Sequence, residues 1–198
     1  INAVDAGASL EIETSGASVE INDEVVLEVD TTINEYGAGD VDFNSTVDSD
    51  SGEQNTLTIG VSAGSLTCAE SVGAADEIDG TPGNTALGSL VGDADTVIIG
   101  TGGNVVEVVV DGAINLRSGA SLAGPAGNNT TSRLDAAIVS IDTTGAGAGT
   151  GTVELAGVTS GVATGSDLEV DAAGDVNATS INLSGTVSDR GSLAVTAN

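Results

Sequence analysis

The sequence lacks several residue types on which common protein chemistries depend. Its 198 residues contain no His, no Met and no Trp, all three basic residues are arginine, and Tyr36, Phe43 and Cys68 each stand alone in their class. The absence of His excludes Ser-His-Asp and Cys-His catalysis and imidazole metal sites. The absence of Lys excludes Schiff-base chemistry and a P-loop lysine. One Cys can form neither an intrachain disulfide nor a zinc cluster.

Positive charge is also scarce, because 30 acidic residues face only 3 basic ones and the formal net charge is -27. This balance argues against nucleic-acid binding, since contacts to phosphates are made mainly by Lys and Arg. A strongly acidic surface keeps a protein soluble but repels itself, and salt or divalent cations relieve that repulsion. We therefore expect an extracellular or cell-surface location.

Long hydrophobic runs are missing too. No stretch of 18 apolar residues occurs, so we expect no membrane span. The chain begins at Ile1 without a Met, which predicts either a processed mature protein or a segment of a longer one.

Short segments of alternating apolar and polar residues recur along the chain. Leu10–Ile12, Leu57–Ile59 and Leu168–Val170 are examples, and a period of two is typical of a strand with one buried face. Val97–Ile99 and Val105–Val110 are more continuously apolar, which predicts strands buried on both faces. The one helix candidate is the segment 134–140.

A degenerate internal repeat organises these strands. A unit that starts at Val41 and another that starts at Val153 share the same order of apolar segments. About 25 residues separate Val41 from Leu66 and about 23 separate Val153 from Val176, and self-similarity at this period signals a solenoid. Each repeat of a solenoid buries its apolar face only by stacking on a neighbour.

The sequence thus predicts an all-β fold, a parallel β-solenoid (β-helix) of short strands with roughly eight turns at this period. We expect one elongated domain over 1–198, with 1–38 as an N-terminal strand or cap segment. The alternative is a β-sandwich of the immunoglobulin-like or pilin-like kind, which also has short strands and frequent turns. A sandwich normally needs large aromatic residues in its core, and this chain has two aromatics, Tyr36 and Phe43.

Three segments carry a resemblance to a known family: GDVDFNSTVDSD at 39–50, TALGSL at 85–90 and VSIDTTGAGAG at 139–149. They resemble the repeat region of giant bacterial surface proteins of the filamentous-haemagglutinin-like type. The resemblance covers residues 39–198, while residues 1–38 match in style alone. It implies an extended parallel β-helix on or beyond a bacterial cell surface, used for adhesion or as structural material, and it implies no catalytic residues.

Acidic turns are the candidate metal sites. Asp48, Asp50 and Glu53 place alternating carboxylates as at the start of a calcium-binding loop. The fifth position of the loop is Gly52, and no Glu follows at the distance that such a loop requires. A solvated acidic turn is the alternative. Calcium is accordingly the one cofactor that the sequence suggests.

Asparagine and cysteine are the two residue types at which covalent modification is considered. Sequons for N-glycosylation begin at Asn44, Asn128, Asn129, Asn177 and Asn182. Such triplets also arise by chance in a sequence rich in Asn, Ser and Thr. The lone cysteine is expected to be a small buried hydrophobe, with an intermolecular disulfide as the alternative.

The ends of a solenoid expose open strand edges unless they are capped. No amphipathic capping helix is evident at either end of this sequence. We expect the segment that contains Ile1, Val4, Leu10 and Ile12 to act in assembly, by donating a strand to a neighbour or by stacking head to tail. The expected partners are copies of this chain or adjoining repeats of a larger surface protein.

Three functional hypotheses follow. The first is an extracellular structural protein that forms, or belongs to, an acidic filament, fibre or surface layer with an adhesive and mechanical role. The second is a carbohydrate- or calcium-binding module of a large adhesin. The third is a β-helix enzyme that degrades polysaccharides with paired carboxylates. The first is preferred, and we expect no catalysis, because a sugar cleft generally needs aromatic residues for stacking.

Overall fold

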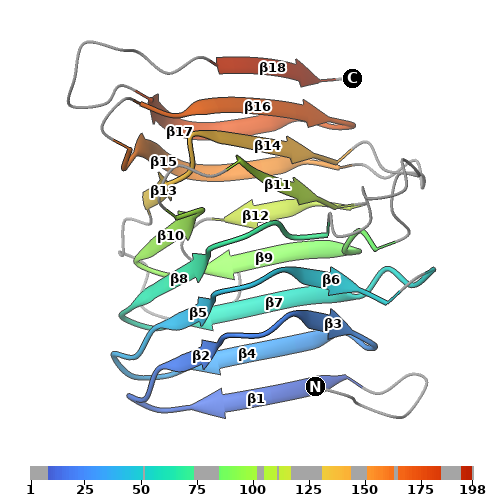
Figure 1. The fold of residues 1–198 in the computed structure, drawn as a ribbon, viewed down its shortest axis with the longest axis vertical. Coiled ribbons are helices and arrows are strands. Elements are labelled where there is room, and N and C mark those ends of the chain that lie inside the picture. The colour runs from blue at the N-terminus through green and yellow to red at the C-terminus, as the bar shows by residue number, and fades with distance from the viewer. Residues whose placement is uncertain are drawn as a thin grey trace.

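Short parallel strands stacked along one axis make up the fold (Figure 1). The structure is a computed structural model that describes residues 9–50, 52–73, 85–101, 105–110, 112–116, 131–143, 151–162, 165–183 and 193–197. Across these residues it contains eighteen strands and no helix, and every strand pair is parallel. The predicted parallel β-solenoid is therefore confirmed, and the sandwich alternative, which is built from antiparallel sheets, is wrong.

The chain lays its strands on three faces in turn, and one full circuit is called a winding here. The described strands make seven windings. The first face consists of β1 (Leu10–Thr14), β4 (Thr31–Glu35), β7 (Thr56–Val61), β9 (Ser89–Asp93), β12 (Ile114–Leu116) and the first parts of β15 (Val153–Ser160) and β17 (Val176–Asn182).

The second face follows after a corner. It consists of β2 (Val19–Ile21), β5 (Val41–Phe43), β8 (Ser65–Cys68), β10 (Thr96–Ile99), β13 (Thr131–Leu134) and the second parts of β15 and β17. Because β15 pairs with β12 through Val153–Leu155 and with β13 through Gly157–Ser160, it joins the first two faces into one twelve-stranded sheet.

The third face completes each winding. It consists of β3 (Val25–Leu27), β6 (Val47–Ser49), β11 (Val105–Val109), β14 (Ile138–Asp142), β16 (Asp167–Ala172) and β18 (Leu193–Ala197). Isolated bridges from Val72 to Val47 and to Val108 connect β6 with β11. The third face is thus one continuous ladder from β3 to β18.

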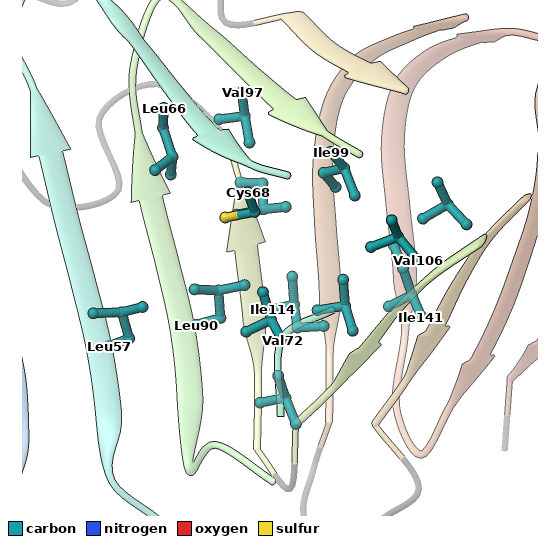
Figure 2. Close-up of a cluster of buried hydrophobic side chains, with 14 of the residues drawn as sticks. Leu57, Leu66, Cys68, Val72, Leu90, Val97, Ile99, Val106, Ile114 and Ile141 are labelled. Carbon is teal, nitrogen blue, oxygen red and sulfur yellow. The ribbon is translucent and has the colours of Figure 1, made fainter. Parts of the chain in front are cut away.

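The core is a set of aliphatic ladders inside the three faces. On the second face Val41, Leu66 and Val97 are register partners on successive strands, and each is at most 1% exposed. Figure 2 shows such side chains meeting in the interior from different sheets. Phe43, 1% exposed, is the aromatic residue of this core. Burial of each Val, Leu or Ile stabilises the fold by about 1.5–3 kcal/mol, so the small side chains suffice collectively.

The corner between the first and second faces is tight and rich in glycine. A Cβ added to Gly64 would lie 2.1 Å from the carbonyl oxygen of Gly39 in the winding before. Beside it, Asp40 Oδ1 accepts hydrogen bonds from the Ser65 backbone N–H at 2.7 Å and from the Ser65 hydroxyl at 2.8 Å. Glycine and a carboxylate thus let the backbones of two windings approach and then hold them together.

The predicted repeat has the right period but the wrong phase. Val41 pairs with Leu66 and Val153 pairs with Val176, so each predicted step is one winding. However, Val41 lies on the second face and Val153 lies on the first. The predicted repeat units are therefore one face out of step, because an apolar-polar-apolar triplet has the same appearance on every face.

Two local expectations are also wrong. Val105 is 58% exposed and Ile98 is partly exposed, so β10 and β11 bury one face and not both. The helix candidate at 134–140 contains the end of β13 and the beginning of β14. Parallel pairing of both strands with their neighbours overrides the weak local helical pattern.

Candidate functional site

The N-terminal end of the solenoid carries an apolar recess. Its walls are formed by nine side chains of the first three windings, of which Thr31 alone is polar: Leu10, Ile12, Ile21, Val25, Leu27, Thr31, Ile33, Phe43 and Leu57. Among the described residues β1 pairs with β4 alone, β2 with β5 alone and β3 with β6 alone. The outer edges of these three strands therefore carry no further strand among the described residues. Leu10, Ile12 and Ile21 are half-buried there, whereas Val25 and Leu27 are buried.

The C-terminal end exposes apolar side chains at core positions. Val195 on β18 is 46% exposed, whereas its register partner Val170 in the winding before is 1% exposed. Ile181 on β17 is 38% exposed, whereas its partner Val158 is fully buried. Leu193 is 48% exposed. These residues would be buried if another winding lay on them.

Amide and phenol donors face many of the outward carboxylates. Asn44 Nδ2 donates to Glu20 Oε1 at 3.3 Å, and Asn177 Nδ2 donates to Glu154 Oε1 at 3.3 Å. In each case the donor lies one winding after the acceptor. In a chain without Lys, these contacts satisfy the carboxylates with neutral donors.

The Tyr36 hydroxyl belongs to the same set of contacts. It donates to Glu13 Oε1 at 3.0 Å, and this hydrogen bond is the main cause of a raised Tyr36 pKa. Tyr36 is 50% exposed and lies directly after β4. This placement agrees with its position at a turn beside Gly37.

Two other carboxylates join windings at the corners. Glu35 is fully buried, and its Oε1 accepts hydrogen bonds from the backbone N–H groups of Gly16 and Gly37, the latter at 2.8 Å. Asp30 Oδ1 accepts from the Thr56 N–H at 2.7 Å. Neither residue was predicted from the sequence to have this role. Their signal was an acidic residue directly before or at the end of a strand.

The predicted calcium loop does not form a cluster of ligands. Asp48 on β6 is 1% exposed, whereas Asp50 and Glu53 are exposed, and Glu53 Oε2 accepts from Asn55 Nδ2 at 3.0 Å. Within the described ranges, no group of three or more acidic or cysteine side chains is placed to hold a metal ion. Calcium binding stays a prediction.

The sequons differ in their surroundings. Asn44, Asn177 and Asn182 are exposed. The amide nitrogens to which a glycan would attach donate to Glu20 in the case of Asn44 and to Glu154 in the case of Asn177. Asn128 and Asn129 lie outside the described residues.

The predicted assembly segment is described in part. Leu10 and Ile12 are half-buried on β1 and line the recess. Ile1 and Val4 lie outside the described residues. The recess extends the predicted segment to β2 and β3, because Ile21 and Val25 contribute to it as well.

The lone thiol is structural. Cys68 on β8 is 5% exposed and faces the core, in agreement with the prediction of a small buried hydrophobe (Figure 2). Burial raises the pKa of the Cys68 thiol to about 12. The thiol is therefore protonated at neutral pH and unreactive.

Comparison of this chain with protein-family models, with curated proteins and with solved structures finds no match. The described residues contain no helix long and apolar enough to cross a membrane.

Proposed function

We propose that this chain is an extracellular structural segment that forms, or belongs to, an acidic β-solenoid filament or surface layer of a bacterial cell, with an adhesive and mechanical role. The observation that carries the proposal is the state of the two ends. Among the described residues no further strand pairs with the outer edges of β1–β3 or of β17 and β18. Apolar side chains are half-buried on β1 and β2 and exposed on β17 and β18. A parallel solenoid buries such groups only against a further winding.

Two other features support this function. The seven windings give a stacked ladder in which hydrogen bonds run along the long axis (Figure 1), the direction in which a fibre carries load. The net charge of -27 from 30 acidic and 3 basic residues keeps such a ladder hydrated and limits lateral aggregation. The resemblance of segments 39–50, 85–90 and 139–149 to filamentous-haemagglutinin-like repeats points in the same direction.

The first test is electron microscopy of the purified chain over a range of protein concentrations, with and without a calcium chelator. We expect filaments of uniform width whose abundance rises with concentration. Loss of the filaments on chelation would assign the acidic side chains to cation bridging. Short rods of one length under every condition would overturn self-assembly.

A second measurement tests the alternative function, in which the chain is a carbohydrate- or calcium-binding module of a large adhesin. Isothermal titration of the chain with calcium and with acidic and neutral oligosaccharides measures saturable binding. Stoichiometric binding by a stable monomer would favour that module over the filament.

A further inference from the structure

We propose that copies of this chain join end to end in one unbroken strand register, with β17 and β18 of one copy laid on β1, β2 and β3 of the next. This inference rests on the proposed function and specifies the junction.

The register follows from the ladders within the chain. On the first face, pairing passes without interruption from Leu10 through the intervening strands to Val176. On the second face it passes from Val19 to Ile181. A copy added in the same register therefore places its Leu10 on Val176 and its Val19 on Ile181.

The third face gives the same answer independently. Its ladder passes from Val25 through Val47 and Val72 to Val195. The added copy then places Val25 on Val195, which is 46% exposed in the single chain. All three faces thus bring an aliphatic residue of the recess end onto an aliphatic residue of the C-terminal end. Of the latter, Val176 is half-buried and Ile181 and Val195 are exposed.

The outward side chains are complementary in the same register. One residue beyond Leu10 is Glu11, and one beyond Val176 is Asn177, so these two meet across the junction. Likewise Glu20 meets Asn182. This is the amide-beside-carboxylate arrangement that Asn44 and Glu20 already make within the chain.

The pairing of carboxylates with amides also sets the direction in which the copies join, head to tail. The Asn177 amide group has two N–H donors, and one of them already donates to Glu154, so the other is available to Glu11 of the next copy. A junction between two N-terminal ends would instead bring Glu11, Glu13 and Glu20 of both copies together, and like charges that face each other are destabilising.

The N-terminal and C-terminal ends of the solenoid have different strand breaks at the corner between the first and second faces. Strand pairing within the chain already accommodates such a difference. At the C-terminal end β17 passes from one face to the other as a single strand, whereas β1 and β2 are separate. The same change occurs within the chain. In one winding β12 and β13 are separate strands, and in the next winding the single strand β15 spans both faces. Pairing is nevertheless retained on both faces.

Cross-linking of paired cysteines tests the register. The variant with E11C and N177C, and the variant with E20C and N182C, are treated with a short bifunctional thiol reagent under conditions that give filaments. The buried Cys68 remains unreactive. We expect a ladder of trimers and longer covalent oligomers from both variants. The mismatched variant with E11C and N182C, whose thiols lie on different faces, should give no ladder.

A charge substitution tests the same contact without cross-linking. Asn177→Asp places a carboxylate against Glu11 of the next copy, and we expect the critical concentration for assembly to rise several-fold and to recover in high salt. Asn115→Asp is the matched control. Asn115 is the register partner of Glu154 within the chain, so the same change of charge is made away from the junction.

The outcomes separate the two proposals. Filaments that cross-link through the mismatched pair, or that assemble equally well with Asn177→Asp and Asn115→Asp, would overturn this junction while leaving the filament function in place. Covalent dimers without longer oligomers from the matched pairs would indicate a closed dimer and overturn the junction. An absence of filaments and of oligomers at all concentrations would overturn both.

Discussion

Leu66 packs into the space beside Gly92, and truncation of Leu66 should lower the stability of the fold by an unusually large amount. Leu66 on β8 is fully buried, and its register partners Val41 and Val97 are also buried. A Cβ added to Gly92 on β9 would lie 2.9 Å from Leu66 Cδ2. Leu66, together with Leu116, whose Cδ2 atom would lie 3.0 Å from the same Cβ, thus fills the space that a side chain at position 92 would otherwise take.

Leu66→Ala leaves a cavity that its surroundings cannot fill, because Gly92 has no side chain and the neighbouring strands are held by their ladders. Leu→Ala substitutions in cores destabilise by about 2–5 kcal/mol and reach the upper end where the site cannot collapse. We expect about 4–5 kcal/mol for Leu66→Ala. Leu57→Ala is the matched control, since Leu57 is 1% exposed but lines the recess at the N-terminal end. We expect about 2–3 kcal/mol for it.

The assay is urea unfolding followed by circular dichroism, with the free energy compared at constant m-value. The double variant Leu66→Ala with Gly92→Ala completes a cycle. Gly92→Ala should destabilise the parent chain and should have a smaller effect once Leu66 is truncated, because Leu116 Cδ2, at 3.0 Å, then still contacts the added methyl group. Equal losses for Leu66→Ala and Leu57→Ala, together with additive behaviour in the cycle, would refute the reasoning.

Three further predictions concern the corners and the core. Glu35→Ala removes the acceptor of the Gly16 and Gly37 N–H groups and should lower the free energy of unfolding in urea by about 1–3 kcal/mol. A loss of stability no larger than that of the control Glu53→Ala, at an exposed position, would contradict this role. Gly64→Ala should disrupt folding, as judged by circular dichroism, because its Cβ would lie 2.1 Å from Gly39 O, whereas Gly157→Ala, 3.2 Å from the flexible Ser180 Oγ, should fold normally. The Cys68 thiol should resist a maleimide at pH 8 in the native chain, because its raised pKa of about 12 keeps it protonated, and should react in denaturant. Rapid labelling of the native chain would contradict this prediction and would show that β8 opens.

Alternation alone predicted most of the strands. Leu10–Ile12, Leu57–Ile59 and Leu168–Val170 all lie within strands, with their apolar residues inward. The period was predicted as well, because Val41 and Leu66 are register partners. Which face a strand occupies could not be predicted, since that depends on corners whose lengths vary from one winding to the next.

The candidate site was predicted less completely. Leu10 and Ile12 were expected at an assembly surface and line the recess, but Ile21 and Val25 could be assigned to it only once three faces were known to converge there. Glu35 was missed for a related reason. Its role depends on Gly16, which belongs to another winding, and no local pattern connects the two.

The distribution of charge explains how so acidic a chain can stack at all. Along the first face the outward register positions from Glu11 to Asn177 pass through Thr32, Thr58 and other uncharged residues before Glu154. Most carboxylates on this ladder therefore have a neutral neighbour in the adjacent winding, and the remaining repulsion is screened by salt. The order is also asymmetric, since the ladder begins with a carboxylate and finishes with an amide. In the proposed assembly, repetition of the chain places Glu11 of one copy beside Asn177 of its neighbour, whereas reversal of one copy brings like groups together. The arrangement that limits repulsion within one copy would therefore also give the proposed assembly its direction.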